Sequence, residues 1–210
     1  IVLSSGAVES PLILMRSGIG PSDQLESLGI PLVKEASGVG ANLRNHPLVF
    51  IQRCLKSDEK INPRPSQVFL RYTATNSPYR GDMSIAPIDD GYDEEQRFAR
   101  FYIALWRPLA SGKLTILSQD PDVPPLLDYQ YLTEAFDVQR MKEGVLKAIE
   151  LTSSHSCKDL LGDLIEPNEE VLRTDSSLEQ WILSVVDTCY HSSGTCKMGP
   201  VSDSKAVVDQ

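Results

Sequence analysis

The chain has 210 residues, a formal net charge of −9 and 41% hydrophobic residues. This composition is typical of a globular protein that can bury one substantial core or two small ones. The acidic charge argues against nucleic acid and anionic membrane surfaces as partners, and no apolar run approaches the roughly 20 residues that a membrane-spanning helix needs. A small-molecule partner is therefore favoured.

A strand, a turn and a helix are predicted at the start of the chain. Residues 1–5 include three β-favouring apolar residues in a row and predict a strand that leads into a turn at Gly6 and Ala7. Ser10 followed by Pro11 predicts a helix N-terminus, because serine caps helices and proline is favoured at the first helical position. We therefore expect a strand-turn-helix unit.

Glycines mark the predicted ends of this helix and of a second, shorter one. Residues 17–20 read Ser-Gly-Ile-Gly and indicate the end of the first helix. Ser22 is the expected cap of the second helix, and Gly29 is its expected stop. Residues 30–33 should then return as a strand, before a glycine-containing loop at 37–47 that marks a boundary.

The middle of the chain, from about residue 49 to residue 117, has the sequence pattern of β-strands. Short stretches rich in β-branched and aromatic residues are separated by turn-forming residues, and antiparallel pairing is the natural interpretation. Residues 107–112 are predicted to form the turn between the last two strands. The expected strands cover residues 49–55, 67–75, 83–88, 98–106 and 113–117.

Two amphipathic helices are predicted after the sheet. The first could be capped by Thr133 or Asp137, and its apolar positions are Val138, Met141, Val145, Leu146 and Ile149. The second opens at residues 176–179, which read Ser-Ser-Leu-Glu and predict a capping box. Its predicted apolar face consists of Leu178, Trp181, Ile182, Val185 and Val186.

A histidine followed by small, turn-forming residues comes directly after the second helix. Residues 190–199 read Tyr-His-Ser-Ser-Gly-Thr-Cys-Lys-Met-Gly. A lone loop histidine more often satisfies backbone groups than performs catalysis. This stretch, however, resembles the His-x-x-Gly-Thr-x-x-Met-Gly segment of the glucose-methanol-choline (GMC) oxidoreductase family. Residues 6–20 resemble the second signature pattern of that family, and residues 38–47 are similar to its following loop, with Asn45 where the family usually has aspartate.

The resemblance spans nearly the whole chain and implies an α/β fold with an α+β substrate part. Residues 1–47 would be part of a flavin-binding, Rossmann-like domain. Residues 48–187 would form the substrate-binding domain, an antiparallel sheet with flanking helices. Residues 188–210 would return to the flavin side with the catalytic loop. Gly6 and Ala7 are the candidate contacts for FAD, because a turn without bulky side chains lets the backbone approach a dinucleotide; from the residues alone, a tight packing turn is equally compatible.

The same resemblance implies oxidation of a primary or secondary alcohol to an aldehyde or ketone, by a choline dehydrogenase-like enzyme or another alcohol dehydrogenase or oxidase. His191 would act as the base or stabilise the developing alkoxide. The alternatives are a binding module without flavin and a flavin-containing lyase that cleaves cyanohydrins. The identity of the alcohol, the electron acceptor and the compartment stay open.

Two family elements are missing from this sequence: the Gly-x-Gly-x-x-Gly motif, which the family places upstream, and a second catalytic His or Asn, which it places downstream. We therefore expect the polypeptide to continue in both directions.

A metal site is the rival interpretation of the histidine segment. Cys189, His191 and Cys196 lie close together in the sequence, and His155 with Cys157 forms another pair. The spacing lacks a Cys-x-x-Cys pair, and cysteines in such positions are more often buried as small apolar side chains. We therefore predict no metal site and no disulfide scaffold.

Overall fold

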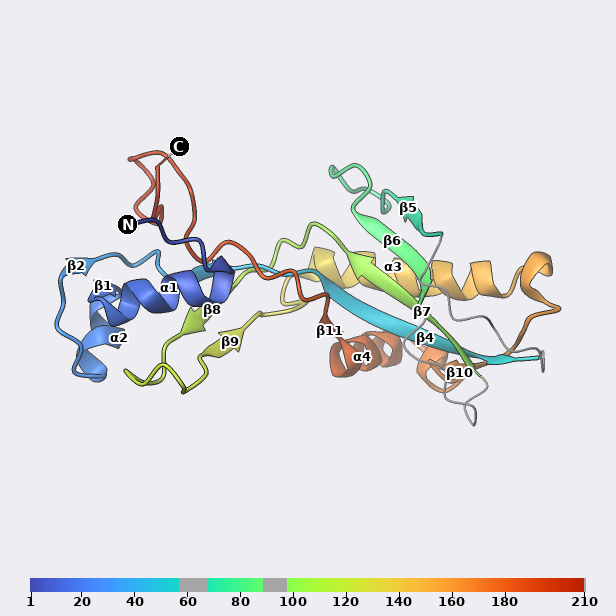
Figure 1. Ribbon diagram of the computed structural model, residues 1–210. Helices are drawn as coiled ribbons and strands as arrows, with labels where there is room; N and C mark the ends of the chain where they lie inside the picture. The colour runs from blue at the N-terminus through green and yellow to red at the C-terminus, as the bar shows by residue number, and fades with distance from the viewer. Residues whose placement is uncertain (57–67, 89–97, 210) are drawn as a thin grey trace. The chain divides into compact units, whose positions relative to one another are not determined.

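The structure, a computed structural model, describes residues 1–56, 68–88 and 98–209. The chain divides into two compact units, whose elements are labelled in Figure 1. Unit 1 combines Ile1–Asn45, Ala110–Tyr131 and Tyr190–Gln210, and unit 2 combines His46–Leu109 and Leu132–Cys189. Among the described residues, no helix has both the length and the apolar composition that a membrane crossing requires.

Unit 1 contains two helices and two small sheets. β1 and β2 pair in parallel, and β8 pairs antiparallel with both β3 and β9. Residues 110–131, which we expected within the middle segment, thus belong to unit 1, because β8 pairs with β3 and not with the large sheet. The elements are α1 (Gly6–Arg16), β1 (Ile19–Gly20), α2 (Ser22–Ser27), β2 (Lys34–Glu35), β3 (Ala41–Leu43), β8 (Gly112–Thr115) and β9 (Leu126–Asp128).

The beginning of unit 1 differs from the sequence prediction. Residues 1–5 form no strand, since they have no pairing partner among the described residues and Ile1 and Val2 are exposed. Helix α1 starts at Gly6, so Pro11 lies inside the helix and Ser10 is not its cap. The predicted strand at 30–33 is also wrong, because pairing with β1 begins only at β2.

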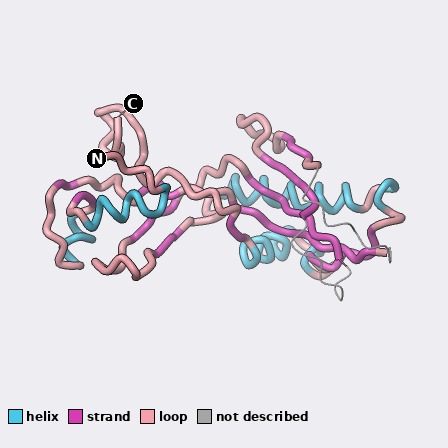
Figure 2. Tube along the Cα trace, in the orientation of Figure 1, coloured by secondary structure: helices cyan, strands magenta, loops and turns pink. Residues whose placement is uncertain are grey.

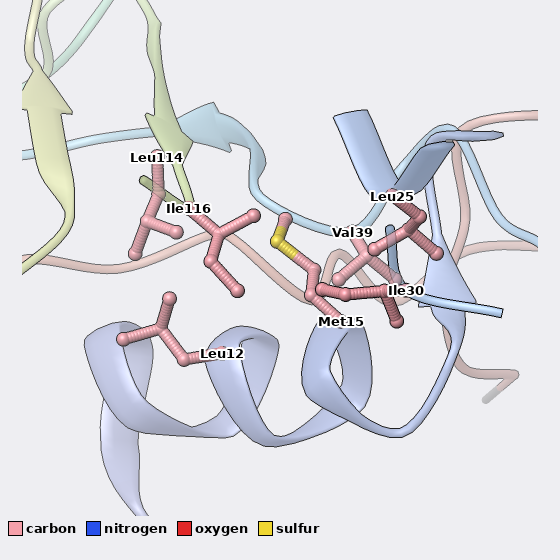
Figure 3. Close-up of a cluster of buried hydrophobic side chains, with 7 residues drawn as sticks. All are labelled: Leu12, Met15, Leu25, Ile30, Val39, Leu114 and Ile116. Carbon is pink, nitrogen blue, oxygen red and sulfur yellow. The ribbon is translucent and has the colours of Figure 1, made fainter. Parts of the chain in front are cut away.

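The core of unit 1 forms where α1 meets α2 and β8. Leu12 and Met15 lie three residues apart on α1 and are fully buried, and Figure 3 shows them beside the other apolar side chains of the cluster. Gly40 passes close to this cluster with φ +81°, and a Cβ there would lie 2.5 Å from the Met15 Cε atom. Only glycine fits at this position. The other cluster members are Leu25, Ile30, Val39, Leu114 and Ile116.

Unit 2 contains an antiparallel sheet with the strand order β10-β4-β7-β6-β5, and β11 pairs with β4. This confirms the predicted antiparallel strands at 49–55, 83–88 and 98–106. Only three residues of the predicted strand 67–75 form β5, and Gln67 lies outside the described residues. The strands are β4 (Pro47–Leu55), β5 (Leu70–Tyr72), β6 (Met83–Ile88), β7 (Phe98–Leu105), β10 (Leu161–Glu166) and β11 (Asp187–Thr188).

Helix α3 (Ala135–Thr152) packs along β7, β6 and β4, with Met141 and Val145 fully buried. Gly144 allows this close approach, because a Cβ there would lie 2.6 Å from the Ile103 Cγ2 atom. Leu146 is 52% exposed, so its predicted place on the apolar face is wrong. One helical residue turns the side chain by about 100°, which carries it away from the sheet.

Helix α4 (Asp175–Val185) packs against α3 and β4, with Leu178 and Ile182 buried. A capping box is present but starts at Thr174 and pairs with Ser177, two residues before the predicted position. Val185 is exposed, contrary to the prediction. Two 3-10 turns, η1 (His155–Cys157) and η2 (Val171–Arg173), lie between the helices.

A buried ion cluster links α3 to the loops of unit 2. The Arg140 side chain, 1% exposed, lies 2.7 Å from Asp82 Oδ2 and 2.6 Å from Asp137 Oδ1. Asp137 is therefore not a helix cap: the N-cap is Glu134, and the Asp137 carboxylate accepts the Leu109 backbone N–H. Asp82 also accepts hydrogen bonds from the Ala74 N–H and the Ser77 hydroxyl. The cluster places one cation between two carboxylates.

Candidate active site

The loop that carries His191 is fixed in unit 1 by hydrogen bonds to residues 42–45. The His191 backbone N–H donates to Asn45 Oδ1 at 3.0 Å, and Asn45 is 4% exposed. Arg44 and Ser193 exchange both backbone hydrogen bonds, each at 2.8 Å. The His191 side chain itself is exposed. The backbone around the histidine is thus held in place while the residue stays exposed.

Asn42 fixes the turn that follows. Its Nδ2 donates to the Gly194 carbonyl at 3.1 Å, and its Oδ1 accepts the Arg44 Nε–H at 3.0 Å. Gly194 has φ +88°, and a Cβ there would lie 2.4 Å from the Asn42 carbonyl oxygen. The turn therefore requires glycine for its backbone conformation and for its close contact.

Tyr129 contacts the loop from the end of β9. Its hydroxyl lies 2.6 Å from Ser192 Oγ, and its ring stacks on Tyr131 with 5.0 Å between the ring centroids. Stacking limits the freedom of the tyrosine ring. Ser192, which directly follows His191, is therefore bonded to a preorganised partner.

Thr195 connects the loop to the first turn of α1. Its hydroxyl donates to the Ala7 carbonyl at 2.5 Å, its own carbonyl accepts the Gly40 N–H at 2.9 Å, and the residue is 1% exposed. This confirms that the His191 loop and the Gly6 turn, far apart in the sequence, meet in the fold.

The two segments line one cleft of about 670 Å³. Gly6 has φ +83°, and a Cβ built there would meet no atom within 4 Å, so its missing side chain leaves space open. The N-terminus of α1 also lies here, and its N-cap Ser5 makes no side-chain capping bond. Backbone N–H groups at a helix start favour anionic groups such as phosphates. The lining residues are Ile1, Leu3, Gly6, Ala7, Ser10, Leu14, Ser192, Ser193, Gly194, Thr195, Cys196 and Val208.

These features fit a dinucleotide such as FAD. A cleft of this size can take part of a large ligand, and the turn at Gly6 presents backbone where a side chain would block approach. Gly6 and Ala7, the predicted cofactor contacts, both line it. Residues 192–196 of the His191 loop line the same cleft.

The other two histidines lie in unit 2. The His46 ring makes an edge contact with the Trp106 ring, with 4.8 Å between centroids. His155 is exposed in η1. None of the three histidines is itself a lining residue of the cleft of unit 1, but His191 directly precedes Ser192, which is one.

The metal interpretation finds no cluster to support it. Within 1–56, 68–88 and 98–209, no three His, Cys, Asp or Glu side chains are grouped so that they could hold an ion. All four cysteines are free. Burial, followed by the Asp187 charge, raises the pKa of Cys189 to about 11, and burial also raises the pKa of Cys196. Both thiols are therefore protonated near neutral pH, which disfavours metal binding and nucleophilic attack.

Sequence reasoning singled out His191, Gly6 and Ala7 but not the residues that hold the loop. A proline inside a helix leaves the carbonyl four residues earlier without its helical donor, which points to Ala7 as an acceptor, but no local pattern identifies Thr195 as the donor. No local pattern indicates that Tyr129 contacts Ser192.

Two family models, both described as GMC oxidoreductase, match this chain over residues 1–48 and 108–210. Oxygen-dependent choline dehydrogenase 1 of Chromohalobacter salexigens is 27% identical over 239 residues, covering 100% of this chain and 42% of the relative. Mitochondrial choline dehydrogenase of Mus musculus is 27% identical over 241 residues, covering 100% of this chain and 40% of the relative. The chain thus spans about two fifths of the length of these relatives.

Solved structures agree with this match. Pyridoxine 4-oxidase from Mesorbium loti aligns with a TM-score of 0.87 and 23% identity, covering 100% of this chain and 42% of that chain. At this identity the likeness shows the fold alone.

Proposed function

Because the chain belongs to the GMC oxidoreductase family, whose members bind FAD and typically oxidise CH–OH groups, we propose that the protein oxidises a small primary or secondary alcohol to an aldehyde or ketone with FAD. The supporting observation is the Thr195–Ala7 bond, which joins the His191 loop to the helix start in one cleft. The naming of two relatives as choline dehydrogenases favours a choline-like alcohol.

FAD would be held at the first turn of α1, where Gly6 and Ala7 line the cleft. Bound flavin supplies an acceptor for the hydride that leaves the alcohol carbon. The turn at Gly6 leaves room for the backbone to contact the cofactor, and the uncapped N–H groups of the helix start favour its negative charge. This chain's contribution to cofactor binding is therefore mainly a backbone surface.

His191 would receive the proton of the alcohol hydroxyl on an imidazole nitrogen. The C–H bond breaks as hydride leaves, the O–H bond breaks as the proton moves to the imidazole, and the C–O bond gains double-bond character. His191 is exposed and directly precedes Ser192, which lines the cleft, while the bond of its backbone N–H to Asn45 limits displacement of the residue. Such positioned acid-base help typically accelerates a reaction by about 10²- to 10⁴-fold.

Flavin reduction tests the proposal in the full-length protein. Purified protein should be yellow, and anaerobic mixing with choline or a panel of simple alcohols should bleach the flavin absorbance. The His191→Ala variant should retain flavin and reduce it about 10²-fold more slowly or worse, with the loss in kcat, because the interaction strengthens as the alkoxide develops.

His155→Ala is the matched control, since His155 is exposed on a turn of unit 2 and should leave the reduction rate unchanged. Colourless protein would favour the binding module without flavin. Yellow protein that releases cyanide from cyanohydrins without flavin reduction would favour the lyase. Unchanged reduction in His191→Ala would overturn the assignment of the base.

A further inference from the structure

We propose that Thr195 is a positioning residue: its hydroxyl holds the His191 loop against the start of α1 through the Ala7 carbonyl that Pro11 leaves free. The bond itself is a property of the fold of unit 1. Its catalytic consequence rests on the proposed function, because it would fix the distance between the base and the cofactor surface.

Pro11 creates the acceptor. In an α-helix the carbonyl of residue i accepts the N–H of residue i+4, so Ala7 would be paired with residue 11. Proline has no N–H, and its ring crowds the carbonyl four residues earlier. Pro11 lies inside α1, so the Ala7 oxygen has no N–H donor at position i+4 and can accept a hydrogen bond from another part of the chain.

Thr195 supplies that partner from a distance of 188 residues in the sequence. The residue is 1% exposed. Its carbonyl oxygen accepts the Gly40 N–H, with 2.9 Å between the nitrogen and the oxygen, and this bond fixes its backbone. The bonds from Asn42, Arg44 and Asn45 attach the loop to residues 42–45, whereas the Thr195 hydroxyl attaches it to the helix.

The location gives the bond a functional consequence. Ala7 and Thr195 both line the cleft, as do Gly6 on one side and Ser192 on the other. Losing the bond releases the loop from the helix that would contact the cofactor. A displacement of about 1 Å between reacting groups can cost about 10²-fold in rate, although the groups themselves are unchanged.

Four variants of the full-length protein test this: Thr195→Val, Thr195→Ser, Pro11→Ala and the double variant Pro11→Ala/Thr195→Val. Valine keeps the shape and removes the hydroxyl, whereas serine keeps the hydroxyl. Alanine at position 11 restores an N–H that can bond to the Ala7 carbonyl, so the hydroxyl of Thr195 becomes dispensable for that acceptor. Ser184→Ala, an exposed position on α4, is the control for an unrelated hydroxyl loss.

The first measurement is hydrogen exchange of residues 191–197 in the full-length protein as purified. We expect about tenfold faster exchange in Thr195→Val, since one hydrogen bond is lost, and little change in Thr195→Ser. In the Pro11→Ala background, Thr195→Val should add a clearly smaller acceleration. Equal accelerations by Thr195→Val in both backgrounds, or no acceleration in either, would overturn the proposed bond.

The second measurement is flavin reduction at saturating alcohol. Thr195→Val should lower the rate about 10- to 100-fold with a smaller change in KM, and Thr195→Ser should recover most of the rate. A change in KM alone would contradict a positioning role. If none of the tested alcohols reduces the flavin of the wild-type protein, the proposed function fails. The exchange measurements still decide whether Thr195 holds the loop.

Discussion

In unit 2, strands β4, β7 and β6 share a continuous antiparallel ladder that one face of α3 covers, whereas unit 1 combines two helices with short strands and loops (Figure 2). Hydrogen bonds join the His191 loop to residues of unit 1 that are distant in the sequence, namely Ala7, Asn42, Asn45 and Tyr129. The strands of unit 2 are therefore held mainly by regular backbone pairing, whereas the His191 loop of unit 1 is held by individual contacts. Candidate functional residues often lie on such loops, supported by regular elements.

Buried polar groups follow the same division. Unit 2 buries a charged cluster around Arg140, whose parts are paired at 2.7 and 2.6 Å. The contacts that hold the His191 loop from Asn45 and Thr195 involve neutral side chains. Removing one partner should therefore have a larger effect on stability in unit 2 than in unit 1, because an unpaired buried charge costs more than an unpaired neutral group.

The largest effect is expected for Arg140→Met. It leaves the carboxylates of Asp82 and Asp137 buried without their cation, and such a loss typically costs about 3–5 kcal/mol. Hydrogen exchange should show lost protection in β6, β7 and α3, while α1 keeps its protection. Lys142→Met, which removes a cation paired with the exposed Asp175, should cost about 0–1 kcal/mol. Equal losses in the two variants would contradict the importance of burial.

Acid should weaken the same cluster, with a smaller effect because protonation of Asp82 leaves the buried Arg140 cation in place. Burial alone would raise the pKa of Asp82, but hydrogen bonds from Ser77, Ala74 and Arg140 and the Arg140 charge hold the pKa below its usual value. The stability from Asp82 is therefore present above its unfolded pKa of about 3.9 and is lost as the pH falls toward the folded value. Urea unfolding of Asp82→Asn from pH 7 to pH 3 should show a shallower loss than the wild type; parallel curves would refute this.

The difference between the units also explains what the sequence could predict. The strands of unit 2 could be located because their side chains alternate along a half-buried surface, as Val49 and Ile51 do on β4. The helix α3 could be located from its apolar period, although Leu146 was wrongly included. In each case the pattern is local, so neighbouring residues carry enough information.

The support of the candidate site is not local. Tyr129 lies 63 residues from Ser192, and Thr195 lies 188 residues from Ala7. No period or cap in the sequence records such pairs. His191 was found through a family motif, and its catalytic role stays a prediction.

In unit 1, comparing Gly194→Ala with Gly6→Ala separates the cost of a left-handed backbone from the cost of a steric clash. Both glycines have positive φ, and left-handed backbone typically costs alanine about 1–2 kcal/mol. Only Gly194 faces a backbone atom, since its added Cβ would lie 2.4 Å from the Asn42 carbonyl oxygen. We expect Gly194→Ala to destabilise unit 1 more and to accelerate hydrogen exchange in the His191 loop. Gly6→Ala should instead lower flavin content, because its methyl group enters the open cleft. Equal losses of stability and equal losses of flavin in the two variants would contradict these different roles of Gly194 and Gly6.

The smallest effect concerns the helix starts. Helix α4 in unit 2 has the Thr174 hydroxyl as acceptor for the Ser177 N–H at 3.0 Å, so Thr174→Ala should cost about 1 kcal/mol in urea unfolding. Helix α1 in unit 1 starts after Ser5, which makes no side-chain cap, so Ser5→Ala should cost only a few tenths of that amount.

An uncapped start is a disadvantage for an isolated helix, but it keeps backbone N–H groups available at the cleft where Gly6 and Ala7 lie. Bound FAD should therefore slow hydrogen exchange in the first turn of α1 and leave the first turn of α4 unchanged. Protection of both turns alike, or of neither, would show that the missing cap has no connection with cofactor binding.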